Sequence, residues 1–430
     1  MKFYSLNNPE AKVSFKHAVV AGIAPDKGLY FPESITALPS SFFEDIASLS
    51  NQEIAFQAIR QFVTDDVTDK KLKEILADML DFEFPVVDIE ENIGALELFH
   101  GPTMAFKDVG ARFMANCLGH FSEDTNEEVT VLVATSGDTG GAVANGFLGV
   151  KGVKVVILYP SGKVSDIQEK QLTTLGQNIE ALEVEGTFDD CQNMVKKAFL
   201  DTEITTTKKL TSANSINVAR WLPQLFYFLF AYKASKSKGR DIVFSVPSGN
   251  FGNICAGMVA QQLGMPVKHF IAATNCNDTV PNFMSSGHYE PKPSTATISN
   301  AMDVGDPSNF VRIRQLHNND FEALKQNLSA YAFDDTTTKK AMLNIYEQSR
   351  YIADPHGALG YLGLKKYLRN KPYTYGIFLE TAHPVKFLDV VENTLGIHLE
   401  IPLRIQAVMH KTKKSHRIGT YEQLKSFLFN

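Results

Sequence analysis

Short apolar runs that alternate with helix-like segments constrain the fold of this chain more than any other feature. Val129–Ala134 is almost continuously apolar and rich in β-branched residues, which is typical of a strand buried on both faces. Lys154–Tyr159 and Ile179–Glu185 follow as further strands, and each of the three is followed by helical spacing. Strands and helices in this alternation form parallel sheets covered by helices. We therefore expect an α/β protein with a compact domain over 128–205.

A second block of alternation lies in the C-terminal half. It is predicted to hold strands at Ile242–Val246, Val267–Ala273 and Tyr375–Leu379, helices at 253–263, 319–331 and 336–347, and a long ordered loop over 277–310. The first 90 residues lack this alternation and are predicted to be mostly helical. Because a chain of 430 residues is too long to form a single hydrophobic core, we expect it to fold in three parts. They are an N-terminal segment over 1–90, a large domain over 91–127 and 206–430, and a small domain over 128–205.

Composition and charge argue against several classes of protein. The net charge of −6 gives no electrostatic reason to bind nucleic acid or an anionic membrane. The four cysteines form no C-x-x-C pair and no cluster with histidine at metal-ligand spacing, so we expect no metal and free thiols. The N-terminus lacks the apolar core of a signal peptide, and Leu225–Ala231 is far shorter than the ~20 residues of a membrane helix. We therefore expect a cytoplasmic protein without a membrane anchor.

Lys107 is the leading candidate for chemistry. It lies in a mostly apolar stretch, LFHGPTMAFKD, at 98–108. Desolvation lowers the pKa of a lysine, which can then act as a nucleophile and proton carrier, as a Schiff-base lysine does. Most lysines are solvated, so Lys107 taken alone is more simply explained as a surface residue at a loop-to-helix junction. Polar turns elsewhere in the chain favour the reactive interpretation.

The turn after the strand at 242–246 has the chemistry of a phosphate site. Glycine, amide and hydroxyl groups precede a helix here, where free backbone N–H groups and the helix dipole favour an anion. The residues concerned are Ser248, Gly249, Asn250, Phe251 and Asn253. The turn lacks the Lys-Ser/Thr ending of a P-loop, which argues against a nucleoside triphosphate. A plain helix-capping turn is the alternative.

Three further polar stretches are weaker candidates. SGDTGG at 136–141 follows a strand and offers Ser136 and Thr139 to an anion. SANSINVAR at 212–220 places Asn214, Asn217 and Arg220 near a helix start, which suits a second anion. Thr381 follows the strand at 375–379. Each stretch also has a structural explanation, as a helix cap or, for the arginine, as a surface charge.

Taken together, these stretches resemble the threonine synthase family, which are pyridoxal-phosphate enzymes of fold type II, related to the tryptophan synthase β subunit. The resemblance rests on LFHGPTMAFKD at 98–108, ATSGDTG at 134–140, VPSGNFGN at 246–253 and TAHPVKF at 381–387. Supporting stretches extend it over essentially the whole chain, from GLYFP at 28–32 onward. It implies two doubly wound parallel-sheet domains with the cofactor pyridoxal 5'-phosphate between them, preceded by the N-terminal segment.

The resemblance also implies an activity and residue roles. The implied enzyme is a lyase that converts O-phospho-L-homoserine and water to L-threonine and phosphate, acting as a monomer or homodimer. Lys107 would bind the cofactor covalently, and Thr381 would form a hydrogen bond with its pyridine nitrogen. The cofactor phosphate would be held by Ser248, Gly249, Asn250, Phe251 and Asn253. The substrate's anionic groups would be held by Ser136, Thr139, Asn214, Asn217 and Arg220.

One position departs from the wider fold type II group. Many of those enzymes have asparagine where this chain has Asp138, and a carboxylate there would repel the cofactor's ring oxygen unless it were protonated or turned away. The role of Asp138 is therefore open. The alternatives to a threonine synthase are a serine/threonine dehydratase, a cysteine synthase, or a binding protein that has lost catalysis. The last should lack Lys107 or Thr381, and both are present.

Overall fold

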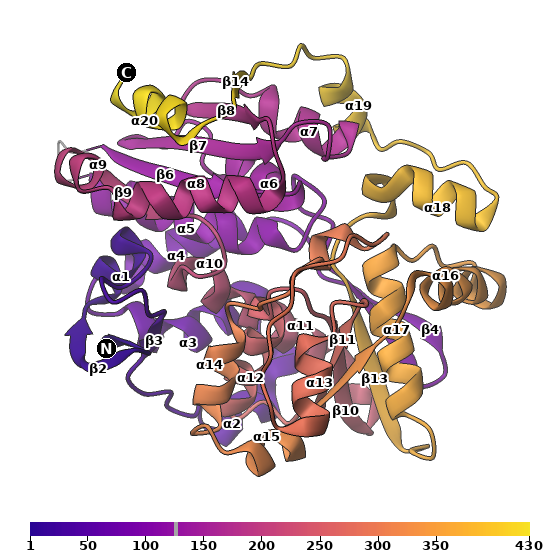
Figure 1. Ribbon diagram of the computed structural model, residues 1–430. Coiled ribbons are helices and arrows are strands. Elements are labelled where there is room, and N and C mark those ends of the chain that lie inside the picture. The colour runs from indigo at the N-terminus through magenta and orange to yellow at the C-terminus, as the bar shows by residue number, and fades with distance from the viewer. Residues whose placement is uncertain (124–127) are drawn as a thin grey trace.

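Three β-sheets organise the described part of the chain, residues 1–123 and 128–430 of a computed structural model (Figure 1). The small sheet has the order β14-β8-β7-β6-β9, with strands His416–Ile418, Ile179–Val184, Val153–Pro160, Val129–Ala134 and Lys209–Ser212. The large sheet has the order β12-β11-β10-β13-β5-β4, with strands Leu328–Ala332, His269–Thr274, Asp241–Pro247, Thr374–Glu380, Ile93–Glu97 and Val86–Glu90. The N-terminal sheet has the order β2-β1-β3, with strands Asn8–Val13, Phe3–Ser5 and Tyr30–Pro32.

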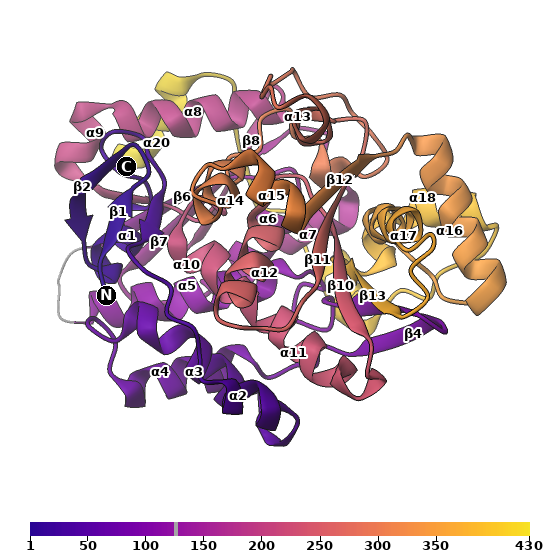
Figure 2. The same ribbon diagram turned by 90° about the horizontal axis from the view of Figure 1, so that it is seen from below.

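Helices flank the sheets. Those that precede β9 are α1 Phe15–Ala21, α2 Ser40–Asp45, α3 Asn51–Val63, α4 Asp69–Met79, α5 Lys107–Ser122, α6 Asp138–Gly146, α7 Asp166–Thr173, α8 Phe188–Leu200 and α9 Thr202–Thr207. Those that follow it are α10 Val218–Trp221, α11 Leu225–Ser235, α12 Gly252–Gln262, α13 Thr279–Ser286, α14 Phe310–Leu316, α15 Phe321–Asn327, α16 Asp335–Ser349, α17 Pro355–Tyr367, α18 Leu388–Leu395, α19 Leu403–Met409 and α20 Tyr421–Phe429. Figure 2 shows the large sheet between α17 on one side and α11 and α12 on the other.

The predicted doubly wound α/β architecture is confirmed. The pairs within the small sheet are parallel, as are those of the large sheet except β4 with β5. Successive residues of β6 face opposite sides, so that Val131 and Val133 join one apolar cluster while Leu132 joins another with residues of α8 and α20. Both faces of the strand are covered, which is why its sequence is continuously apolar.

Several elements differ from the sequence prediction. Residues 328–331, predicted as the end of a helix, form β12, an edge strand parallel to β11. The small sheet also takes in β9 and β14, although the sequence predicts 206–430 for the large domain. Apolar residues of β14 and α20 pack onto the outer face of the small sheet, which holds the C-terminus there. The predicted boundary at 127/128 falls beside 124–127, which lie outside the described residues.

The N-terminal segment, predicted to be mostly helical, contains α1 to α4 and also the sheet β2-β1-β3, which was not predicted from the sequence. Two of these strands have only three residues, and the longest, NPEAKV, is largely exposed. None of the three therefore shows a clear alternation of apolar and polar residues. Among the described residues, no helix is long and apolar enough to cross a lipid bilayer.

A close approach between α5 and α10 provides a test of the packing. A Cβ on Gly110 would lie 2.3 Å from the carbonyl oxygen of Arg220, so Gly110→Ala requires the helices to separate. We expect the free energy of unfolding to fall by about 1–3 kcal/mol in denaturant titrations, although alanine favours helices. Gly119→Ala on the same helix is the control, since a Cβ there would meet only the Val150 side chain, at 3.2 Å. We expect this control to change the free energy of unfolding by less than about 1 kcal/mol. Equal stability of the two variants would contradict this packing.

Candidate active site

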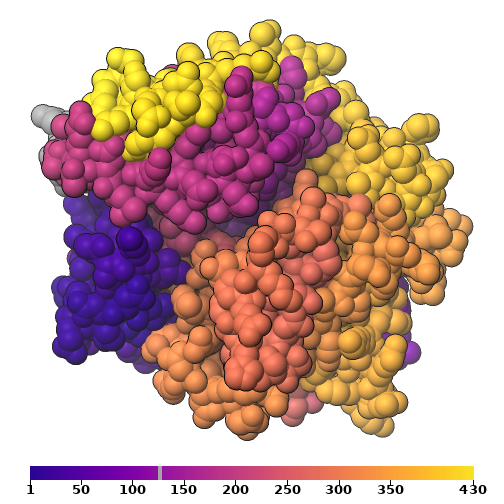
Figure 3. Space-filling model, viewed as in Figure 1, coloured from indigo at the N-terminus to yellow at the C-terminus, as the bar shows by residue number. Residues whose placement is uncertain are grey.

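A cavity of about 2380 Å³ opens where strands of the small sheet and of the large sheet end. The elements around the small sheet form an upper lobe in Figure 1, and those around the large sheet form a lower lobe. Figure 3 shows a recess between these two lobes on one face of the molecule. The wall combines the turns after β6, β10 and β13 with the start of α5, and the N-terminal segment adds Lys16 and His17. Ligands of doubly wound proteins bind at the carboxyl ends of parallel strands, so this cavity is the natural candidate site.

Main-chain hydrogen bonds bring Lys107 and Thr381 to the same side of this cavity. The loop between β5 and α5 runs along the end of β13, where the N–H of Phe106 donates to the Thr381 carbonyl at 2.9 Å. The N–H of His383 donates to the Met104 carbonyl at 3.1 Å. Lys107 is the first residue of α5 and lines the cavity together with Thr381. The Thr381 side chain forms no hydrogen bond with the described residues, so its hydroxyl is available to a ligand.

The surroundings of Lys107 make its charged form less stable than it is in water. Burial lowers the pKa of Lys107 to about 8; Asp138 opposes this shift, whereas Lys386 and Arg220 contribute to it. An amine whose pKa lies near neutrality is a competent nucleophile and proton carrier. This environment is consistent with the prediction of a reactive lysine at position 107.

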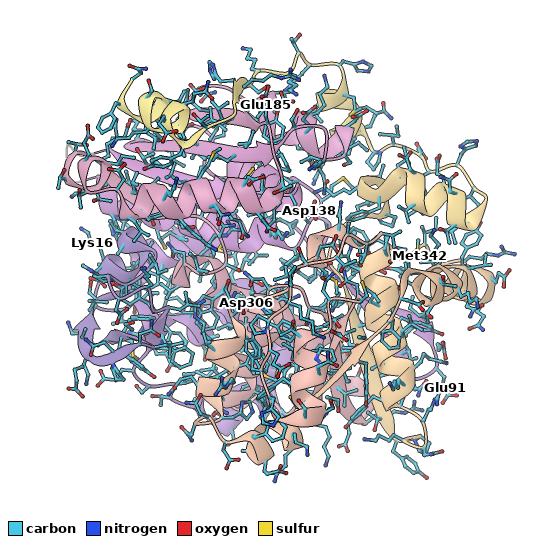
Figure 4. All side chains as sticks on the ribbon, in the orientation of Figure 1. Lys16, Glu91, Asp138, Glu185, Asp306 and Met342 are labelled. Carbon is cyan, nitrogen blue, oxygen red and sulfur yellow. The ribbon has the colours of Figure 1, made fainter. Side chains whose placement is uncertain are left out.

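Asp138 is ionised and paired. Its Oδ1 accepts hydrogen bonds from Lys386 Nζ at 2.7 Å and from Gln168 Nε2 at 2.9 Å. Burial acts to raise the pKa of Asp138, but Lys386 and Lys107 together hold it well below the ordinary range. Figure 4 shows Asp138 at the edge of the upper lobe that faces the lower one. Lys386 belongs to the motif TAHPVKF but was not predicted as a site residue. Its position just after a buried strand is the sequence signal that could have identified it.

The turn between β10 and α12 has the shape of an anion cradle. Phe251 has a φ of 60°, and a Cβ on Gly249 would lie 2.8 Å from Met302 Cα. Among the described residues, the N–H groups of Gly249, Asn250 and Phe251 find no acceptor, and they lie at the start of α12 on the cavity wall. Unpaired N–H groups at a helix N-terminus suit a phosphate.

Polar side chains hold this turn in shape. The Ser248 hydroxyl donates to the Val246 carbonyl at 2.8 Å, and Asn253 Nδ2 donates to the Pro247 carbonyl at 3.0 Å. Asn250 donates to the Ser215 hydroxyl at 2.9 Å and accepts from the N–H of Ser308 at 2.6 Å. Asn250 and Asn253 line the cavity, whereas the Ser248 side chain points back into its own turn. The backbone of the turn is therefore the part that is free for a ligand.

These groups fit pyridoxal 5'-phosphate. A lysine with a lowered pKa suits the aldehyde, the unpaired N–H groups suit the phosphate, and the free Thr381 hydroxyl suits the ring nitrogen. Lys107 begins α5, Thr381 directly follows β13, and the cradle residues that reach the wall lie in the turn before α12; all of them line one cavity.

The predicted substrate residues are brought together with one exception. Ser136, Thr139, Asn214 and Arg220 line the cavity. The Arg220 guanidinium is buried and donates to the Ala213 carbonyl, while its Nε has no partner among the described residues. Asn217 does not reach the cavity: its Nδ2 donates to the Val19 carbonyl at 2.9 Å, and its Oδ1 caps α10. Its predicted ligand role has no geometric support here.

His356 also lines the cavity and was missed by the sequence analysis. Its Nδ1 lies 2.8 Å from an Asp354 carboxylate oxygen, which orients the ring, and its buried Nε2 has no partner among the described residues. The residue lies within the first turn of α17, in a run of small residues that carries no recognisable motif.

Fold and site together define a pyridoxal-phosphate-dependent enzyme of fold type II. Residues 91–375 match the family described as pyridoxal-phosphate dependent enzyme, 2–79 match threonine synthase N terminus, and 357–428 match threonine synthase, C-terminal. The chain is 43% identical to the threonine synthase of Escherichia coli over the full length of both chains, and 36% identical to that of Saccharomyces cerevisiae over 89% of this chain and 87% of the relative. The chain belongs to the threonine synthase family.

Solved structures agree with this assignment. The crystal structure of Escherichia coli threonine synthase superposes with a TM-score of 0.94 at 43% identity, covering all of both chains. The PLP-bound threonine synthase of Brucella melitensis gives a TM-score of 0.93 at 31% identity, covering 100% of this chain and 98% of that one. Serine racemase from Dictyostelium discoideum shares the fold alone, with a TM-score of 0.54 at 17% identity, over 74% of this chain and 98% of that one.

Proposed function

We propose that the protein converts O-phospho-L-homoserine and water to L-threonine and phosphate. The observation that carries the proposal is the presence of two groups of anion-binding residues on the wall of the cavity that Lys107 lines. One is the N–H cradle before α12, and the other combines Arg220 with the start of α6. A phosphorylated cofactor and a phosphorylated substrate require two such places. The relatives named threonine synthase support the same activity.

Each group then has a defined task. Bound pyridoxal phosphate supplies an electron sink that makes carbon–hydrogen bonds next to the amino group acidic. Lys107 moves protons at Cα and Cβ of the substrate. Thr381 offers a neutral hydroxyl to the ring nitrogen, which does not force protonation there as a carboxylate would. Arg220, Ser136, Thr139 and Asn214 hold the substrate's phosphate and carboxylate, and loss of phosphate from Cγ is followed by addition of water at Cβ.

We also propose that the enzyme works in the cytoplasm as a monomer or homodimer. Cys117, Cys191 and Cys255 are buried as free thiols, which suits a reducing compartment. The residues assigned to the site come from a single chain, so the proposal needs no partner to complete the cavity.

A product assay tests the function. Purified protein supplied with pyridoxal phosphate and O-phospho-L-homoserine should release phosphate and L-threonine in equal amounts. A dehydratase would instead form ammonia and a keto acid from serine or threonine, and a cysteine synthase would require sulfide. Protein that binds the cofactor without turning over phosphohomoserine would support the non-catalytic alternative and contradict the proposal.

A further inference from the structure

A buried ion pair joins the two lobes beside Lys107. Lys386 Nζ lies 2.7 Å from Asp138 Oδ1, and the two side chains are 0% and 4% exposed. Asp138 begins α6 of the upper lobe, whereas Lys386 lies in η5 (Pro384–Phe387), the 3₁₀ turn that follows β13 of the large sheet. Gln168 of α7 donates to the same carboxylate oxygen, so the bond between the lobes is a defined contact with an orienting partner.

Two lysines are near this one carboxylate, and only one of them is bonded to it. Asp138 acts electrostatically on Lys107, as does Lys386. Lys386 takes the hydrogen bond, while Lys107 forms none with the described residues, and its Nζ lies 5.6 Å from the centre of the Phe106 ring. A buried carboxylate without a partner is costly, so removal of Lys386 would draw Asp138 and Lys107 together.

A purely structural link does not need charge at this place. Burying an ion pair costs desolvation that often cancels the Coulomb attraction, and apolar side chains of similar volume serve as well. A charged pair kept beside a reactive amine therefore points to an electrostatic purpose.

We propose that Lys386 is a positioning residue that occupies Asp138 and thereby keeps the Lys107 side chain from pairing with this carboxylate, so that it stays available on the cavity wall. The inference deepens the proposed function and rests on the assigned role of Lys107. The other charged groups near this lysine in space or in sequence are consistent with it. Arg220 on α10 is a cation and disfavours a charged Lys107. Asp108 on α5 is itself occupied, since its carboxylate accepts the N–H and the hydroxyl of Thr103.

The test measures the titration of Lys107 in the full-length protein without cofactor. Trace acetic anhydride is applied across a pH series, and acetylation of the Lys107 peptide is quantified by mass spectrometry against an internal amine standard. Lys386→Met should raise the pKa of Lys107 by about one unit or more, because a nearby cation is lost and a carboxylate is freed. Asp138→Asn should lower it, and the Asp138→Asn/Lys386→Met double variant should bring it back towards the wild-type value.

Two further variants separate charge from structure. Lys386→Arg keeps the cation and should restore a titration close to wild type. Lys413→Met is the matched control, since Lys413 also pairs with carboxylates of the upper lobe, at 2.6 Å from Glu169 and 2.8 Å from Glu183, but not beside Lys107. It should leave the titration of Lys107 unchanged.

The kinetic readout follows from the same shift. With Lys386→Met the acidic limb of the kcat profile, which reports the substrate complex in which Lys107 acts as a base, should move to higher pH, whereas a general loss of structure would lower activity at every pH. An unchanged Lys107 titration in folded Lys386→Met would overturn the inference. If that variant does not fold, an unchanged titration in Asp138→Asn would overturn it instead. Failure of the proposed function is detected separately, by the absence of threonine in the wild-type product assay.

Discussion

Lys107→Ala should reduce turnover by about 10⁴-fold or more, because the variant loses both the covalent attachment of the cofactor and the proton carrier. The cradle before α12 is independent of this side chain, so the variant should still bind pyridoxal phosphate, with weaker affinity. Steady-state phosphate release and equilibrium dialysis of the cofactor measure the two effects. Lys70→Ala, at an exposed position on α4, is the control and should retain wild-type turnover.

Borohydride reduction identifies the attached lysine directly. Reduction of the wild-type holoenzyme followed by peptide mapping should place the cofactor on the peptide that contains Lys107. Lys386 is the informative alternative, because it is a second buried lysine within electrostatic range of Lys107. Cofactor found on Lys386, or substantial turnover by Lys107→Ala, would contradict the assignment.

Arg220→Ala should lower kcat/KM for O-phospho-L-homoserine roughly 30- to 5000-fold, because a buried cation that faces the substrate anion is removed. This loss corresponds to about 2–5 kcal/mol of transition-state stabilisation. The cofactor's visible absorbance should persist, since the Arg220 guanidinium donates to the Ala213 carbonyl, whereas the proposed phosphate cradle consists of the backbone N–H groups of the turn before α12. Arg220→Lys should recover part of the loss, since the ammonium keeps the charge but not the planar guanidinium.

Arg220 also supports its own surroundings, so stability must be measured alongside the kinetics. Its guanidinium donates to the Ala213 carbonyl, and its own carbonyl accepts from Gln224. Denaturant titration of Arg220→Ala shows whether the fold survives. A folded variant with unchanged kinetics, or one that loses the cofactor absorbance together with activity, would contradict the substrate role.

The core of the fold was predictable from the sequence because its strands are buried on both faces. β6, β7 and β10 are predominantly apolar runs of six to eight residues, rich in valine and isoleucine, which stand out from any helical pattern. β12 and the N-terminal strands were missed because edge and surface strands are short and partly exposed, so their identity depends on their partners. The joining of β14 to β8 links residues more than 230 positions apart, which no local pattern records.

The site was predictable to the extent that its signals are local. Lys107, the turn at 248–253 and Thr381 each lie directly after a strand or at a helix start, where sequence shows the turn chemistry. The part played by Lys386 depends on Asp138, which is 248 positions away, and the free Nε2 of His356 depends on packing. Asn217 was predicted as a substrate ligand, but its side chain caps α10 instead. The sequence alone does not distinguish these two roles of an asparagine before a helix.

The fate of oxygen from water tests the central claim most directly. The protein is incubated with O-phospho-L-homoserine in H₂¹⁸O, and both products are analysed by mass spectrometry. Elimination of phosphate from Cγ and addition of water at Cβ should place one ¹⁸O in the threonine hydroxyl and none in the phosphate. Label in the phosphate with unlabelled homoserine as the other product would show hydrolysis of the phosphate ester, and would contradict the account.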